Sequence, residues 1–190
     1  MRKKPEILPK ILKARTIART RVFHIEELEL RFSNGREVTY ERARGSAHGS
    51  VLIVPVKDQD TLLLVREYCV GPERYELAFP KGLIDAGETA LEAGNRELRE
   101  ETGYGARRVT PLMNMSIAPG YHSHVTQAVI AEDLYPSRLE GDEPEPVEVV
   151  EWSMNDIHVL LQRDDFSEAR SIAALYLTRD YLLGKETSST

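Results

Sequence analysis

The sequence has little of several features that would mark a specialised class of protein. Cys69 is the single cysteine among 190 residues, so no internal disulfide can form and a reducing compartment is the simplest expectation. We expect Cys69 to be a small, buried apolar residue. No apolar run is long enough for a signal peptide or a membrane span, which predicts a cytoplasmic protein with no membrane partner.

The charge balance does not favour nucleic acid as a partner. Lys and Arg number 25 against 31 Asp and Glu, which gives a formal net charge of -6. An anionic small molecule remains compatible with this charge, because a bound Mg²⁺ inverts the local field. Residues 1–21 carry eight Lys or Arg, and we expect them to form a solvated basic edge. The length suits one main domain with a small appendage.

The most informative stretch is 82–104, which reads GLIDAGETALEAGNRELREETGY. Thr89 and Glu92 have the spacing of a capping box, so a helix should begin at Ala90. It should end at Thr102, because Gly103 can adopt the left-handed conformation that closes helices. The stripe of Ala90, Leu91, Gly94 and Leu98 is expected to face inward.

On another face of this helix, Glu97, Glu100 and Glu101 stand at i, i+3 and i+4. Like charges at this spacing are unfavourable, and Arg96 and Arg99 offset them only partly. Most Glu-rich helical faces are simply solvated. A hard divalent cation such as Mg²⁺ would instead use several of these oxygens as ligands.

The spacing favours the second interpretation. Gly82, five residues, Glu88, seven residues and then REXREEXG from Arg96 resemble the signature of the Nudix hydrolases, with Tyr104 where an aliphatic residue is usual. The resemblance implies an α/β (α+β) fold, a Nudix α/β/α sandwich with a mixed sheet. It also implies an enzyme that splits diphosphates linked to another moiety.

The resemblance further assigns roles to residues of this stretch. Glu97 and Glu101 would be the principal metal ligands, and Glu100 a third ligand or a catalytic residue that holds water. The backbone carbonyl of Lys81 or Gly82 would complete a site for two or three Mg²⁺, with Mn²⁺ as a possible substitute. Structural roles fall to Gly82, Glu88, Arg96 and Gly103.

Before this stretch, the sequence predicts a β-hairpin. Two β-like runs, 21–32 and 37–44, flank an Asn-Gly turn within 33–36. We therefore expect residues 1–45 to form an N-terminal hairpin region for dimerisation and substrate contact, and residues 46–190 to form the Nudix domain. The resemblance to the ADP-ribose pyrophosphatase-like group suggests that the hairpin packs on a second subunit, giving a homodimer. The alternative is a hairpin folded on its own chain.

The rest of the chain alternates strands and helices. Strands are expected at 51–56, 61–65, 125–131 and 147–152. Helices are expected at 154–162 and 168–183, with Asn155 and Ser167 as caps and Gly184 as the stop. Arg66, at the end of a buried strand, is a candidate phosphate clamp, because its planar fork matches a phosphate. Its alternative role is partner to Glu67 or another acid.

Two later segments supply the remaining candidates. The acidic, proline-broken stretch 139–146 cannot be helical, and the resemblance makes Glu145 the candidate general base, with Glu143 and Glu148 as alternatives. Pro119, sixteen residues after Gly103, resembles the marker of the ADP-ribose group. His122 and His124 could contact a ribose or phosphate or could simply be loop histidines, and they do not form a zinc site. Arg42 is a candidate for the adenine.

Short segments along nearly the whole chain resemble the subgroup that hydrolyses ADP compounds. This implies a small-molecule nucleotide substrate such as ADP-ribose, diadenosine di- or triphosphate, or NADH, with AMP as the shared product. Two alternatives stay open: a Nudix hydrolase of nucleoside triphosphates or sugar nucleotides, and a non-catalytic nucleotide sensor. The complete carboxylate set favours the enzyme.

Overall fold

A computed structural model describes residues 7–188 of the chain. These residues divide into an N-terminal unit, which is the chain up to Ala47 together with Ser116–Val125, and a main unit, which is His48–Met115 together with the chain from Thr126 onward. The elements in chain order are β1 Lys10–Arg19, β2 His24–Arg31, β3 Glu37–Ala43, β4 Ser50–Pro55, β5 Thr61–Cys69, β6 Arg74–Ala78, β7 Lys81–Leu83, α1 Ala90–Thr102, β8 Tyr104–Ser116, β9 Val125–Pro136, β10 Glu148–Ser153, the 3₁₀ turn Met154–Asp156, α2 Ile157–Leu160 and α3 Ala169–Ser188.

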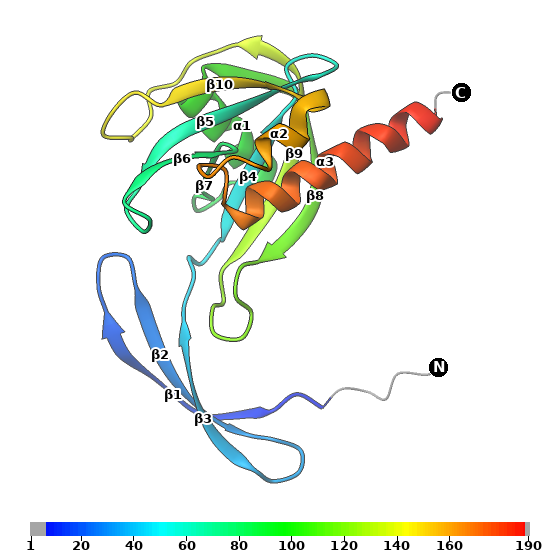
Figure 1. Cartoon of the computed structure of the whole chain (residues 1–190). Helices are drawn as coiled ribbons and strands as arrows, with labels where there is room; N and C mark the ends of the chain where they lie inside the picture. The colour runs from blue at the N-terminus through cyan, green and yellow to red at the C-terminus, as the bar shows by residue number, and fades with distance from the viewer. Residues whose placement is uncertain (1–6, 189–190) are drawn as a thin grey trace. The chain divides into compact units, whose positions relative to one another are not determined.

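The main unit is a three-layer α/β/α sandwich, as the sequence predicted. Strand β4 lies at its centre and all six of its residues are buried. Its Val51 and Ile53 pack on the α1 side with Ala93 and Leu98. Its Leu52 and Val54 pack on the opposite side, against the layer that contains α2 and α3. Figure 1 shows α1 behind the strands and α2 and α3 in front. Burial on both faces is the reason for the continuous apolar run at 51–56.

Two sheets make up the middle layer. One is mixed, with the order β7-β4-β9-β8, in which β4 runs parallel to β9 and antiparallel to β7. The other has the order β10-β5-β6 and is antiparallel. The short pairing of β7 with β4 matters most for function, because it fixes Lys81 and Gly82 opposite Leu52 and Val51 at the entrance to α1.

The C-terminal helices differ from the sequence prediction at their ends. The segment 154–162 forms only the 3₁₀ turn and the four-residue α2, and Ser153, not Asn155, caps the turn. Helix α3 begins at Ala169, where the carboxylate of Glu168 accepts from Ser171 N, and it passes through Gly184 to Ser188. Gly184 does not stop the helix, because a single glycine costs a helix only about 1 kcal/mol. No helix of residues 7–188 is long and apolar enough to cross a bilayer.

The N-terminal unit is an antiparallel sheet with the order β1-β2-β3. Strands β2 and β3 are the predicted hairpin, turning at Gly35 with φ of 84°. Strand β1 was not predicted, because its basic residues suggested a solvated edge. The segment 116–125 also belongs to this unit, with Ala43 N donating to Tyr121 O at 2.8 Å, whereas the sequence assigned it to the 46–190 domain. Residues 1–6 and 189–190 of the expected domains lie outside the described residues.

Candidate active site

Helix α1 is built as the local sequence predicts. The Thr89 side chain accepts from Glu92 N and the Glu92 carboxylate accepts from Thr89 N, so both halves of the capping box are present. Gly103 closes the helix with φ of 77°. The inward stripe differs at one residue, because Ala93 is buried and Leu91 is exposed. A Cβ on Gly94 would lie 3.2 Å from Ile53 and Val129, which allows α1 to approach the sheet closely.

The three glutamates of α1 sit in unequal environments. Glu97 and Glu101 keep only 8% and 4% of their surface exposed, whereas Glu100 is half-buried. Burial raises the pKa of Glu101 to about 8, although the positive charge of Lys81 opposes the shift. Burial also raises the pKa of Glu97, against the effect of Arg96. Buried carboxylates of this kind strongly favour a positive partner.

Arg96 is the cation that organises this helix face. Its Nε and Nη2 donate to the two Glu88 oxygens at 2.9 and 3.0 Å, and Nη2 also donates to Leu83 O at 3.0 Å. Its Nη1 donates to Glu97 at 2.7 Å and to Glu100 at 3.0 Å. The hydrogen bonds from Arg96 lower the pKa of Glu88. All five guanidinium N–H groups therefore have acceptors, and they join α1 to the loop before it.

The donor set suits a hard divalent cation in type and number. Glu101 Oε1 accepts from Lys81 N at 3.2 Å, but its Oε2 is buried without a hydrogen-bond partner. A Cβ on Gly82 would lie 2.0 Å from Glu97 Oε1, so only glycine leaves room for that carboxylate. No three His, Cys, Asp or Glu side chains of residues 7–188 are arranged to hold an ion. Arg96 Nη1 instead donates to the Glu97 and Glu100 oxygens that such an ion would need as ligands.

These side chains line a cleft of about 640 Å³ in the main unit. One wall comes from β5, β7 and α1, and the other comes from the loop 137–147. Eight acidic and two basic side chains line it in the described chain, namely Glu67, Asp85, Glu97, Glu100, Glu101, Glu140, Asp142, Glu143, Lys81 and Arg96. Such an acidic cleft can accept an anionic substrate only if cations accompany it.

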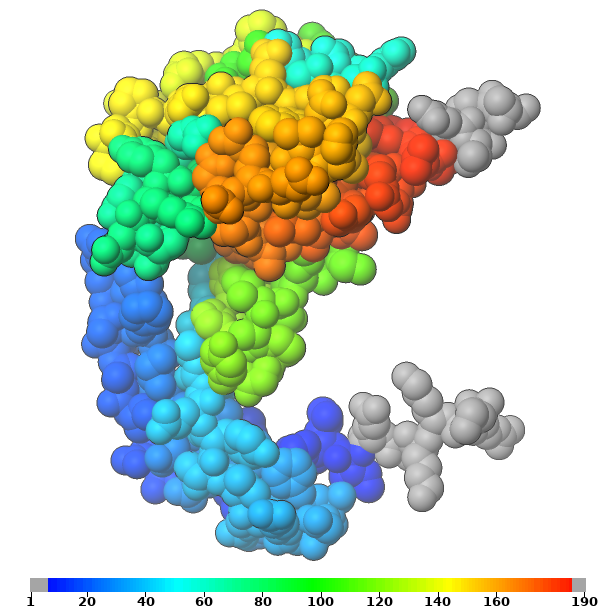
Figure 2. All heavy atoms as spheres, viewed as in Figure 1, coloured from blue at the N-terminus to red at the C-terminus, as the bar shows by residue number. Residues whose placement is uncertain are grey.

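The loop 137–147 brings Glu143, rather than Glu145, to this cleft. Its first part is tied to α1, with Ser137 N donating to Gly103 O at 2.9 Å and Leu139 N to Arg99 O at 3.2 Å. Farther along, exposed Glu145 accepts a 2.6 Å hydrogen bond from Tyr75 OH, which raises the pKa of Tyr75. Figure 2 shows the yellow loop at the surface beside the blue-green β5–β6 hairpin. The third candidate, Glu148, is exposed and pairs with Arg66.

Arg66 has acidic partners in the structure. Its Nε donates to Glu148 at 3.1 Å and its Nη1 donates to Asp165 at 2.5 Å. Hydrogen bonds from Arg163 and then Arg66 hold the pKa of Asp165 at about 2. These contacts match the alternative role that the sequence left open for Arg66. The next residue, Glu67, points to the other side and lines the cleft.

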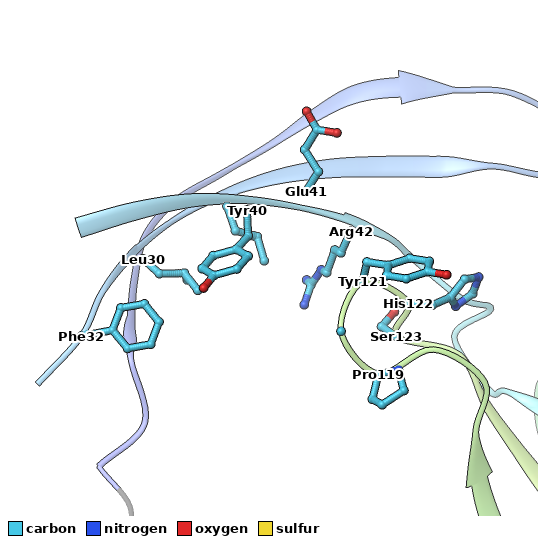
Figure 3. Close-up of a pocket in the computed structure, with 11 residues that line it drawn as sticks. Leu30, Phe32, Tyr40, Glu41, Arg42, Pro119, Tyr121, His122 and Ser123 are labelled. Carbon is cyan, nitrogen blue, oxygen red and sulfur yellow. The ribbon is translucent and has the colours of Figure 1, made fainter. Parts of the chain in front are cut away.

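Arg42 lines a pocket of about 310 Å³ within the N-terminal unit. Figure 3 shows Tyr40 and Arg42 on one side of β3 and Glu41 on the other. The loop residues Pro119, Tyr121 and His122 form the facing wall. Arg42 donates from Nε and Nη2 to Glu26 Oε2 at 3.0 and 2.9 Å, and these bonds lower the pKa of Glu26. His124 N donates to His122 Nδ1 at 3.0 Å, which orients that ring.

Three features of the site were not recognised from the sequence. They are Glu67, the ammonium of Lys81, and Tyr75. Strand pairing brings Glu67 and Lys81 to the cleft, and a long-range hydrogen bond joins Tyr75 to the loop 137–147. The nearest signal was the polar Arg66-Glu67 pair at the end of an apolar run. Cys69, expected to be buried, is half-buried at the end of β5, where burial still raises the pKa of its thiol.

Comparison with known proteins defines the class. Residues 47–175 match the family model of the NUDIX domain. The chain therefore belongs to the Nudix hydrolase family, whose members use a divalent metal such as Mg²⁺. Residues 9–42 match a second model, described as the NudE-type Nudix hydrolase N-terminal domain. The second match covers the strands of the N-terminal sheet, whereas the first covers most of the main unit together with the segment 116–125 of the N-terminal unit.

Individual relatives extend along almost the whole chain. ADP compounds hydrolase NudE of Escherichia coli (strain K12) is 51% identical over 93% of this chain and 95% of its own. ADP-ribose pyrophosphatase of Bacillus subtilis (strain 168) is 29% identical over 87% and 92%. A crystal structure described as an ADP compounds hydrolase superposes with a TM-score of 0.89 at 49% identity, covering 96% of this chain and 98% of that one. The fold predicted from the sequence is thus confirmed.

Proposed function

We propose that this Nudix enzyme hydrolyses the diphosphate bond of ADP compounds and releases AMP. The substrates that we expect are ADP-ribose, diadenosine di- and triphosphate, and NADH. The observation that carries the proposal is the acidic cleft of α1, with the buried, unpartnered Oε2 of Glu101, in a chain 51% identical to an ADP compounds hydrolase. The cytoplasmic location expected from the lack of long apolar runs stays a prediction.

The proposed metal ligands are Glu97, Glu101 and Glu100, with the backbone carbonyl of Lys81 or Gly82. Two or three Mg²⁺, or Mn²⁺ in their place, would supply positive charge against the diphosphate and lower the pKa of the water that attacks it. In this proposal Arg96 and Glu88 hold the loop of Gly82 against α1, and Gly103 ends the helix. Arg96 would release carboxylate oxygens to the ions while keeping its bonds to Glu88.

The proposed general base lies in the loop 137–147. Glu143 is favoured for accepting the proton of the attacking water, because its half-buried side chain lines the cleft. Glu145 would then hold the loop in place through its hydrogen bond with Tyr75, although it remains the alternative candidate for the general base. A general base within hydrogen-bond reach contributes about 10² to 10⁴ in rate.

Further substrate contacts are proposed for Arg42 and Arg66. Arg42 shares its pocket with Tyr40 and Tyr121, whose rings suit a planar base such as adenine. Arg66 could act on a phosphate only by leaving Glu148 or Asp165, so we rank it below Arg42. Among the described residues, His122 is a further candidate for the ribose.

We extend the proposal to a homodimer formed through the N-terminal sheet. Of its described apolar residues, Leu28 is buried, whereas Ile7, Leu8, Ile11, Ile17, Val22 and Phe23 are exposed. Exposed apolar residues grouped in this way are typical of a protein–protein interaction surface. Sedimentation equilibrium of the purified protein tests this, and a monomer at micromolar concentration would exclude it.

The decisive experiment for the reaction is product chromatography with Mg²⁺. ADP-ribose, diadenosine triphosphate, NADH and a nucleoside triphosphate are incubated with wild-type protein and with Glu101→Gln. We expect AMP from the first three substrates and none from the variant. Cleavage of the nucleoside triphosphate alone would support a different Nudix activity, and binding without cleavage would indicate a sensor.

A further inference from the structure

The acidic cleft contains one cation whose hydrogen-bonding capacity is mostly unused. Arg96 has all five of its N–H groups engaged with Glu88, Glu97, Glu100 and Leu83 O. Lys81 has three N–H donors on Nζ. Within residues 7–188 that ammonium donates to a single acceptor, Glu67 Oε1. It is therefore the cleft's remaining donor for an anionic ligand.

The backbone holds Lys81 at the carboxylates. Strand β7 pairs with β4 so that Lys81 lies opposite Leu52, whose side chain is fully buried. Lys81 N donates to Glu101 Oε1, so the same residue contacts a proposed metal ligand through its backbone and faces the cleft through its side chain. The side chain is 18% exposed, which limits its freedom to leave the cleft.

Glu67 determines where this ammonium lies. It sits on β5 opposite Glu76 of β6, and its side chain is 30% exposed. An ion pair at this degree of burial keeps a lysine from extending into solvent, although it contributes little net stability. The pair therefore holds a positive charge at the cleft wall while leaving two N–H groups for another acceptor.

We propose that Lys81 Nζ binds a non-bridging oxygen of the substrate's diphosphate and that Glu67 is the positioning residue that holds it there. This inference rests on the proposed function, because it requires a diphosphate ligand. The ammonium would neutralise charge at one non-bridging oxygen, in addition to the positive charge that the ions proposed at α1 would supply to the diphosphate. Charge-assisted hydrogen bonds of this kind are about twice as strong as neutral ones.

The test measures equilibrium binding of α,β-methylene-ADP, whose carbon bridge resists hydrolysis, in the presence of Mg²⁺. We expect Lys81→Met to weaken binding about 10- to 100-fold. Lys81→Arg should retain most of the affinity. Mn²⁺ binding, measured separately by electron paramagnetic resonance, should stay within about threefold of wild type in both. Lys57→Met is the matched control, since Lys57 pairs with Glu151 outside this cleft and should change neither quantity.

Glu67→Gln and the double variant separate this role from a merely structural ion pair. If Lys81 binds the phosphate and Glu67 positions it, the Oε1 of Glu67→Gln still accepts from the ammonium but without a negative charge, so affinity falls about three- to tenfold, less than in Lys81→Met. The Lys81→Met/Glu67→Gln double variant then stays as weak as Lys81→Met. If the pair is structural, Glu67→Gln alone impairs binding and the double variant regains it, which overturns the inference. Unchanged binding in Lys81→Met overturns it too. Absence of ADP-ribose cleavage by the wild type would instead contradict the proposed function.

Discussion

The two walls of the acidic cleft are built in different ways. Helix α1 is capped at both ends by its own sequence, and its carboxylates are held by Arg96 and by Lys81, which is 20 residues before Glu101. The loop 137–147 has no regular structure, and its Glu145 is held by Tyr75, seventy residues earlier. The difference teaches that the wall with the proposed metal ligands is encoded by nearby residues, whereas the loop of the proposed base depends on the tertiary fold.

Removing a carboxylate from the rigid wall should have the largest effect. We expect Glu101→Gln to lower turnover of ADP-ribose by about 10³-fold, because the neutral glutamine can no longer balance the charge of a bound cation. Mn²⁺ affinity should fall in parallel, measured by electron paramagnetic resonance. Glu151→Gln, an exposed glutamate on β10, is the control and should behave as wild type. Full Mn²⁺ affinity in Glu101→Gln would remove Glu101 from the metal site.

In the loop 137–147, Glu143→Gln should lower kcat by about 10²-fold with Mn²⁺ affinity nearly intact, because only the proton acceptor is lost. Glu145→Gln should cost less, since its amide oxygen can still accept from Tyr75. Steady-state kinetics of both variants decide the assignment. The reverse order, with Glu145→Gln the slower enzyme, would return the base to Glu145.

The buried carboxylate of α1 should also make the metal-free protein sensitive to pH. The pKa of Glu101 rises from 4.5 to about 8 on folding, so the folded state holds an extra proton between these values. The free energy of unfolding therefore falls as pH rises through this window. We expect the Tm in EDTA to decrease by several degrees between pH 5 and 8, at roughly 2–4 °C per kcal/mol.

Glu101→Gln provides the control for this pH effect, because glutamine does not titrate. Its metal-free Tm should match wild type near pH 5 and exceed it above pH 8. Added Mg²⁺ should remove most of the pH dependence of the wild-type Tm, because the ion stabilises the ionised carboxylate, and should change the Tm of the variant little. Parallel Tm curves for the two proteins without metal would show that Glu101 is not the titrating group.

The same contrast explains how much the sequence could predict. Thr89, Glu92 and Gly103 act within one helix, so α1 was located to the residue, and β4 was recognisable because both of its faces are buried. The segment 154–162 reads as a helix but forms only short turns, since tertiary packing overrides a weak local preference. The contacts of Arg66 with Asp165 and of Tyr75 with Glu145 join distant segments, and no local pattern encodes them.

The smallest expected effect tests whether the loop really depends on that distant contact. Tyr75→Phe removes only the hydroxyl that donates to Glu145, and a hydrogen bond worth about 1 kcal/mol corresponds to roughly fivefold in rate. We expect kcat to fall by this amount while KM and Mn²⁺ affinity stay unchanged, because α1 is untouched. Tyr68→Phe is the matched control, since the Tyr68 ring packs edge-on against Tyr75 at 5.6 Å. Equal kinetics in the two variants would mean that the loop holds its proposed base without Tyr75, by its attachments to α1 and β10 alone.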